Sequence, residues 1–146
     1  MRWINQTTEM STKNKFGYFE IDGKKLGPDD PIILCYFHRR DIGATIVQDV
    51  TYVDSKGVSW YAEKNDEFNG ASIPRFWRRL WTPYSPRLRD ASLFHDIYCT
   101  LRCRPQKQTH YMYWEALRCL GVWETTADIQ WFCIVWWCYF RYWNWK

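Results

Sequence analysis

The stretch Ser85–Leu101, SPRLRDASLFHDIYCTL, decides the fold of the second half of the chain. It opens with a Ser-Pro pair, which is typical of a helix start because serine caps the first turn and proline fits within it. Four residues that follow one another at steps of three or four share one face of this helix, which is apolar apart from a histidine. They are Leu88, Ala91, His95 and Tyr98. We therefore expect His95 to lie in the core or along its edge.

Three further helices are expected from their start and stop residues. They are a short helix capped by Ser72, a helix from Pro105 to Gly121, and a last helix capped by Thr125 or Thr126 that reaches about Tyr142. The last helix is apolar almost all round, which is typical of a buried helix, a membrane-interface helix or a protein contact. We expect it to dock against the sheet and to leave part of its aromatic surface for a partner.

The first half of the chain carries strand signals. Strands are expected at Phe16–Ile21, Pro31–His38, Ile42–Val53 and Val58–Ala62, with a hairpin at Asp22-Gly23. Strands followed by helices indicate an α+β fold, a small N-terminal antiparallel sheet and then a C-terminal bundle of about four helices. Residues 1–15 are expected to form a flexible arm. Residues 16–146 are expected to form a single domain, mainly β over 16–64 and mainly α over 65–146.

Composition bounds the function classes. The chain has 146 residues, of which 47% are apolar and 20% aromatic, and its net charge is +4. These values fit one domain with a substantial core and exclude a disordered chain. The mild charge makes nucleic acid an unlikely partner, and we interpret the arginines between residues 75 and 89 as a solvated helix face.

Neither a secretion signal nor a membrane span is expected. The first 14 residues are polar and contain no apolar run. The longest apolar stretch, Ile129–Phe140, has about a dozen residues and is shorter than the roughly 20 that cross a bilayer. The six cysteines contain no C-x-x-C pair, so we expect reduced thiols, as in a cytoplasm.

Candidate chemistry centres on His95. Asp96 follows it about 100° round the helix, so the two side chains do not face each other but can line one cleft. If the helix from Pro105 packs antiparallel to the first, His110 approaches His95. Imidazole and carboxylate groups serve as general bases and as ligands of divalent metals, here calcium or zinc. Cys99 and Cys103 continue the four-residue spacing from His95, but we interpret them as packing residues.

The loop Asn69-Gly70-Ala71-Ser72-Ile73-Pro74-Arg75 precedes these helices. Its glycine and small polar residues can supply backbone N–H groups to an anion, hydrate a metal, or cap a helix. We favour capping for Ser72 over a nucleophilic role.

Several blocks together resemble a known family, the domain of unknown function thirteen-fifty-three, which is found chiefly in phages, prophages and bacteria. They are Phe68–Trp77, His95-Asp96-Ile97-Tyr98, and Trp114–Leu117 with Gly121, and the resemblance covers about residues 68 to 142. It implies a phage-type origin and marks Asn69, Gly70, Ser72 and Arg75 as a signature loop. The chain departs from the family pattern at Asn69 and at His110, where acids are expected. If those acids bind a metal or orient a base, this copy is altered.

The run His95-Asp96-Ile97-Tyr98 also resembles the active-site helix of phospholipase A2 enzymes. This resemblance implies that His95 is a general base and Asp96 a calcium ligand. The acid that orients the histidine in those enzymes has no clear counterpart.

Two functions of different classes fit the sequence. The first is a hydrolase-like enzyme with His95 as general base and Asp96 as base partner or metal ligand; a metal site would use His95, Asp96 and His110. The second is a non-enzymatic phage virion or tail accessory protein. Through its aromatic last helix the chain would contact other phage proteins, a second copy or a membrane interface. It would be made in the host cytoplasm and could end in the virion.

Overall fold

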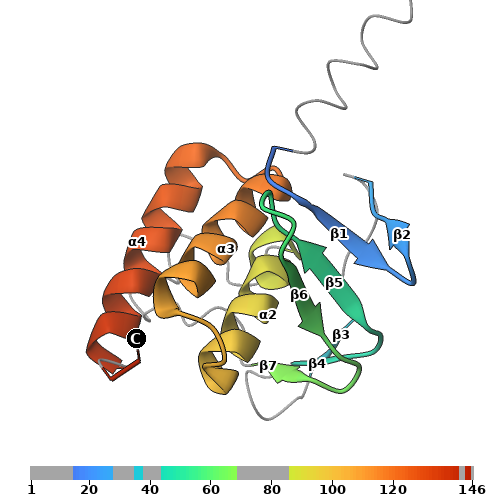
Figure 1. Cartoon of the computed structure of the whole chain (residues 1–146), viewed down its shortest axis with the longest axis horizontal. Helices are drawn as coiled ribbons and strands as arrows, with labels where there is room; N and C mark the ends of the chain where they lie inside the picture. Colours follow the sequence, from blue (N-terminus) through green and yellow to red (C-terminus); the bar gives the residue numbers. More distant parts are fainter. Residues whose placement is uncertain (1–14, 28–34, 38–43, 69–85, 142–143, 146) are drawn as a thin grey trace, which may run out of the picture.

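The computed structural model of the chain describes residues 15–27, 35–37, 44–68, 86–141 and 144–145 (Figure 1). In these ranges every strand precedes every helix, which confirms the expected α+β class. The N-terminal arm, apart from residue 15, and the short helix expected at Ser72 lie outside the described residues. The described part therefore contains three helices where about four were expected.

The larger sheet has four antiparallel strands in the order β2-β1-β5-β6. These are β1 (Tyr18–Ile21), β2 (Lys24–Lys25), β5 (Val50–Val53) and β6 (Ser59–Ala62). The hairpin expected between β1 and β2 is confirmed, since Asp22 and Gly23 both have positive φ, at 51° and 74°. Such angles match the twist of a two-residue hairpin.

A second antiparallel sheet, in the order β3-β4-β7, was not anticipated. It contains β3 (Cys35–Phe37), β4 (Ala44–Ile46) and β7 (Glu67–Phe68). The single strand expected over Ile42–Val53 is therefore wrong, because β4 and β5 belong to different sheets. The break between them is held by Asp49, whose carboxylate accepts the Lys64 backbone N–H at 2.7 Å. An alternating pattern continues through such a bend and does not reveal it.

The helices are α2 (Pro86–Leu101), α3 (Gln106–Cys119) and α4 (Glu124–Arg141). The expected bounds of α2 and α3 hold within one or two residues. The stop at Gly121 is confirmed by its φ of 79°, which glycine adopts without strain. The expected cap at Thr125 or Thr126 is wrong, since both lie inside α4.

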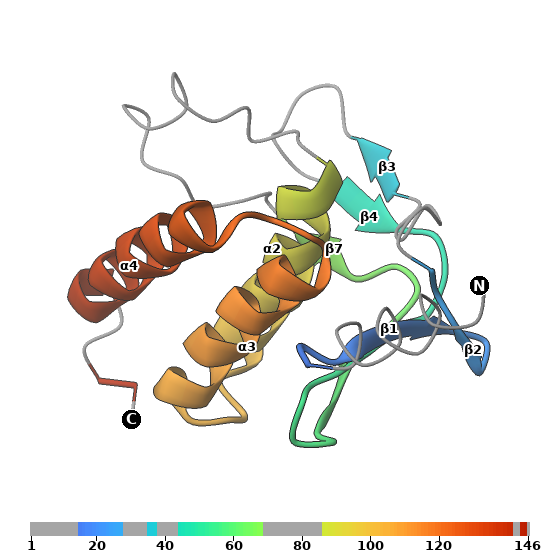
Figure 2. The same ribbon diagram turned by 90° about the horizontal axis from the view of Figure 1, so that it is seen from above.

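Helix α2 lies against the larger sheet, α3 lies beside α2, and α4 packs on α3 (Figures 1 and 2). Helices α2 and α3 run antiparallel through the connection at residues 102–105. The expected docking of the last helix against the sheet is therefore wrong. Helix α3 provides the apolar surface that α4 covers.

The core is aromatic and fills the layer between the larger sheet and α2. Tyr52, Trp60 and Phe94 are all fully buried. The rings of Trp60 and Tyr98 meet edge to face, with 4.7 Å between their centroids. The ring centroids of Phe19 and Tyr52 are 4.8 Å apart. The high aromatic content thus builds the contact that fixes α2, and with it His95, on the sheet.

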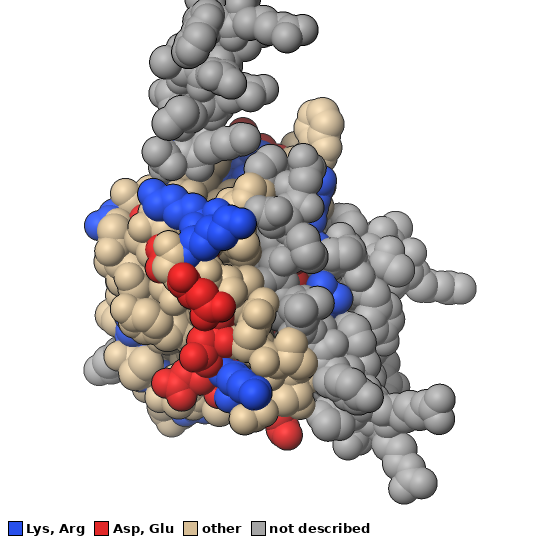
Figure 3. All heavy atoms as spheres, turned by 90° about the vertical axis from the view of Figure 1, so that its right-hand side faces the viewer, with Lys and Arg blue, Asp and Glu red and all other residues tan. Residues whose placement is uncertain are grey.

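Charges on the sheet side of the molecule are mixed. Figure 3 shows a band of acidic side chains with lysines and arginines at both ends, beside a region that is not described. Within the described helices, none is both long and apolar enough to cross a membrane.

Candidate functional site

Two histidines meet where α2 and α3 pack together. His95 Nε2 lies 2.9 Å from His110 Nδ1, which is hydrogen-bond distance, and the rings are tilted by 31°. Both residues are buried, with 4% and 3% of their surface exposed. The antiparallel helices therefore place His110 against His95, the approach that their short connection predicted.

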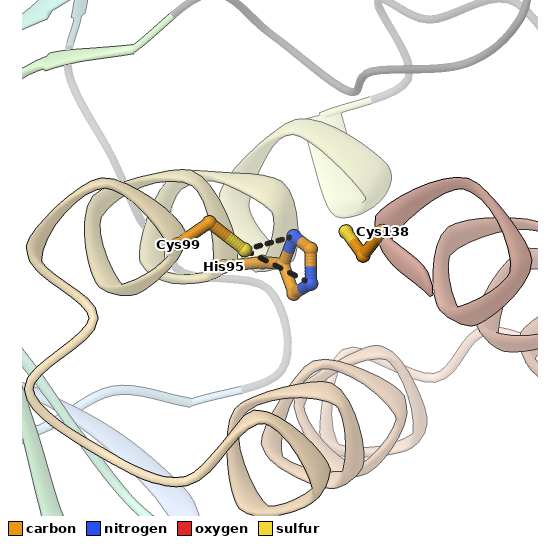
Figure 4. Close-up of side chains that lie close together, drawn as sticks. All are labelled: His95, Cys99 and Cys138. Carbon is orange, nitrogen blue, oxygen red and sulfur yellow. Dashed lines mark hydrogen bonds between the residues drawn. The ribbon is translucent and has the colours of Figure 1, made fainter. Parts of the chain in front are cut away.

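Two cysteines lie beside this pair. Cys99, one turn after His95, places Sγ 3.6 Å from His95 Nδ1 and 3.5 Å from Nε2. Cys138 reaches the same point from α4 (Figure 4). One ligand atom from each of His95, Cys99 and Cys138 lies within 4.8 Å of the others, and all three residues are buried. Cys103 is exposed and is not part of this group.

Burial keeps the imidazoles neutral. It lowers the pKa of His95 from 6.5 to about 3, with a smaller contribution from His110. Burial alone lowers the pKa of His110 from 6.5 to about 4. Each ring then has one N–H and one free nitrogen at neutral pH, so one ring donates the hydrogen bond that joins them.

The acidic groups are shifted as well. Burial raises the pKa of Asp96 well above its usual 3.8, and the nearby Cys138 raises it further. A hydrogen bond between the two thiols raises the pKa of Cys99 and lowers that of Cys138. Clustered perturbed groups of this kind are typical of functional sites.

Asp96 does not orient His95. Its Oδ1 lies 4.0 Å from His95 Nδ1, which is too long for a hydrogen bond. Among the described residues, Asp96 Oδ2 and His110 Nε2 are buried without a hydrogen-bond partner. Buried polar atoms of this kind are uncommon and costly unless a ligand or water meets them.

The other expected site residues, Asn69, Gly70, Ser72 and Arg75, lie outside the described residues. A described cavity of about 240 Å³ is lined by Phe16, Tyr111 and Glu115, among others, and not by His95 or Asp96. The sequence did not identify Cys138 as a site residue. Its place depends on how α4 crosses the other helices, and no local signal encodes that crossing.

The comparison with protein families assigns the chain. The family described as "Protein of unknown function (DUF1353)" matches residues 44–134, more than half of the chain. The chain belongs to this family. The DUF1353 match includes β4 to β7, α2, α3 and part of α4, so it begins earlier and ends earlier than the expected 68 to 142. His95, Asp96, Cys99 and His110 lie inside it, whereas Cys138 lies beyond its end.

Two curated relatives of this DUF1353 protein come from Sinorhizobium fredii. The uncharacterized protein y4iH is 29% identical over 87 residues, which cover 59% of this chain and 36% of the relative. The uncharacterized protein y4jT is 30% identical over 82 residues, which cover 54% of this chain and 24% of the relative. The chain thus spans about a third and a quarter of these longer proteins. No solved structure matches it.

Proposed function

We propose that this DUF1353 chain is a hydrolase-like enzyme whose water-activating centre is His95 with Asp96. The observation that carries the proposal is the meeting of α2, α3 and α4 around His95. Three groups gather there: a neutral imidazole, a second imidazole at 2.9 Å, and a buried carboxyl with one oxygen that has no hydrogen-bond partner among the described residues. Hydrolysis requires a group that activates water and a group that accepts its proton, and this centre offers both.

The geometry favours a metal-dependent form over direct base catalysis by His95. A catalytic imidazole becomes cationic when it takes a proton, and a neighbouring carboxylate normally stabilises that charge. Here the hydrogen-bond partners of His95 among the described residues are His110, which is itself neutral, and the Cys99 thiol, and neither gives such stabilisation. His95 is better suited to hold a divalent ion, with Asp96 as the proton acceptor. Such an ion lowers the pKa of bound water to about 7.

The test uses the purified full chain, saturated with zinc, against three probe classes: an aryl ester, an aryl phosphate and phospholipid vesicles. Asp96→Asn keeps the size of the side chain and removes the proton acceptor. We expect it to lower turnover at least about a hundredfold, within the usual range for loss of a general base, without lowering the melting temperature. Asp128→Asn on α4 is the matched control, because its side chain lies outside the proposed centre and accepts the Trp114 N–H at 2.7 Å.

Two outcomes would contradict the proposal. One is turnover that survives in Asp96→Asn. The other is the absence of turnover with all three probe classes in a zinc-saturated protein.

A second candidate is a non-enzymatic assembly component, and the outer face of α4 favours it. Phe132, Trp136 and Phe140 are 60%, 60% and 65% exposed and form a continuous aromatic stripe. Exposed apolar patches of this kind mark contact surfaces on proteins. In this role the chain would bind other phage proteins or a second copy through α4. Light scattering of wild type and Trp136→Arg tests the second copy, which predicts a dimer that the substitution dissociates.

A further inference from the structure

We propose that His95, Cys99 and Cys138 form a binding site for a thiophilic divalent cation of the zinc type, which ties α4 to α2. The inference deepens the proposed function, because it uses the same His95 and rests on that centre being the functional one. It replaces the expected ligand set of His95, Asp96 and His110 by a set with two sulfur atoms.

The candidate ligand atoms lie close enough together to converge on such an ion. In tetrahedral zinc sites the metal lies about 2.0–2.1 Å from nitrogen and about 2.3 Å from sulfur, so ligand nitrogen and sulfur atoms are roughly 3.6 Å apart. Cys99 Sγ lies 3.6 Å from His95 Nδ1 and 3.5 Å from Nε2, so the Cys99 side chain must rotate before its sulfur and the Nδ1 lone pair meet at one ion. The third ligand, Cys138 Sγ, also lies within 4.8 Å of the other two ligand atoms. The view in Figure 4 shows both sulfur atoms beside the imidazole of His95.

The ring of His95 is oriented for this role by His110. With Nδ1 as ligand, the Nε2–H of His95 donates to His110 Nδ1 across the observed 2.9 Å. Metal-bound histidines nearly always donate their second ring N–H to a partner, which fixes the tautomer and the direction of the ring. His110 is therefore a positioning residue and not a ligand.

The charge and the donor atoms select the ion. Binding of M²⁺ breaks two S–H bonds, forms two metal–sulfur bonds and releases two protons to solvent. Two thiolates balance the charge of the ion, so the buried centre carries no net charge, which lowers the cost of burying it. Sulfur and imidazole ligands suit zinc, whereas calcium takes oxygen ligands. The donor set thus favours zinc over the calcium that the phospholipase resemblance implied.

The carboxyl group of Asp96 lies beside the proposed ligands. Asp96 Oδ1 lies 4.0 Å from the same Nδ1 of His95, and its other oxygen has no partner among the described residues. Three protein ligands and one open position are typical of catalytic zinc sites. Asp96 is placed to accept a proton from water at the open position.

The experiment uses the full chain, reduced, stripped with a chelator and titrated with Co²⁺ and then Zn²⁺. We expect one equivalent of cobalt per chain, with thiolate-to-cobalt absorption and the visible bands of a tetrahedral complex, displaced by zinc. Free zinc at a hundredfold excess over its dissociation constant should raise the folding equilibrium constant about a hundredfold, measured by denaturant titration. Cys99→Ser and Cys138→Ser should abolish both effects. Cys103→Ser is the matched control, because Cys103 is exposed and follows the end of α2, four residues after Cys99 in the sequence, and it should retain them.

A second measurement, made on the wild-type protein, tests the site even if the cysteine variants fail to fold. In wild type, zinc should protect Cys99 and Cys138 from alkylation, mapped by mass spectrometry, and leave Cys103 reactive. The site is overturned if cobalt binds without thiolate absorption, if binding survives in Cys138→Ser, or if protection does not depend on zinc. Metal binding without turnover refutes the proposed function and leaves the site intact. If metal-free protein shows turnover and Cys138→Ser does not alter it, the metal site is overturned. The proposed catalytic role of His95 and Asp96 would then stand.

Discussion

Replacing Asp90 by asparagine should stabilise the protein at pH 8. Asp90 lies on α2 and is 3% exposed, and burial raises the pKa of its carboxyl from 3.8 to about 6. The folded state therefore binds this proton more tightly than the unfolded state does. The contribution of this protonated carboxyl to the free energy of unfolding is fully present below about pH 4 and is lost as the pH rises through 6.

The size of the effect follows from the two pKa values. Each tenfold change in an ionisation constant corresponds to about 1.4 kcal/mol, so the change from 3.8 to about 6 corresponds to about 3 kcal/mol. Asparagine carries no charge at any pH and removes this loss. The carboxylate does gain an opposing attraction from Arg89 at 3.3 Å, but that pair is weaker than the burial penalty, since the net pKa is raised. The amide oxygen of asparagine can still accept the Arg89 N–H.

Urea unfolding at several pH values between 4 and 8 measures the free energy of unfolding of wild type and Asp90→Asn. The two should agree near pH 4, diverge between about pH 4 and 6 and differ by a constant amount above that, with the variant more stable at pH 8 by at most about 3 kcal/mol. Glu63→Gln is the control, because Glu63 is exposed and its substitution should change stability by no more than about 0.5 kcal/mol. A variant less stable than wild type at pH 8 would show that the ion pair with Arg89 outweighs burial and would refute the reasoning.

Two further predictions concern the contacts that hold α2 and the sheet. Gly17→Ala should cost more than about 2 kcal/mol in urea unfolding, because Gly17 has a φ of 81° and an added Cβ would collide with the Val53 carbonyl and lie 2.9 Å from Asp54 Cα; a loss below 0.5 kcal/mol would contradict this. Tyr98→Phe should cost about 1 kcal/mol, since the Tyr98 hydroxyl accepts the Tyr61 backbone N–H at 2.9 Å. An unchanged denaturation midpoint in that variant would show that water replaces the hydroxyl.

The parts of the fold that the sequence predicted are those with local signals. Helix α2 begins at Pro86, the proline of the Ser-Pro pair, and α3 ends before Gly121, which has a positive φ. The positions of both helices therefore follow from residues that are adjacent in the sequence. The division of residues 42–53 between two sheets does not have such a signal. It depends on the pairing of Ile46 with Asn65 and Asp66, whose hydrogen bonds of 2.9 and 3.1 Å join segments about twenty residues apart. Contacts of this range are set by the whole fold and not by the local pattern.

The candidate site divides in the same way. The approach of His110 to His95 could be derived, because both residues lie on inward helix faces and the connection between the helices is short. The four-residue spacing from His95 places Cys99 on the same helix face, but nothing near it in sequence completes a ligand set, so the pattern favours a packing role. The missing ligand, Cys138, is on a helix that was expected to dock on the sheet. Only the packing of α4 on α3 brings it to His95.

His110 stands where the family resemblance implies an acid, and the proposed metal site explains why a neutral side chain suits this position. A carboxylate at that position would favour a cationic His95 and thus a general base. A neutral imidazole at 2.9 Å favours a neutral His95, which leaves a nitrogen lone pair free for a metal. Two thiols then supply the two negative charges that a divalent ion needs, and a third fixed charge would only add repulsion in a buried site. The proposed roles of His110 and Cys138 therefore depend on each other. If the two thiolates hold a divalent ion, a neutral partner for His95 keeps the net charge of the centre at zero.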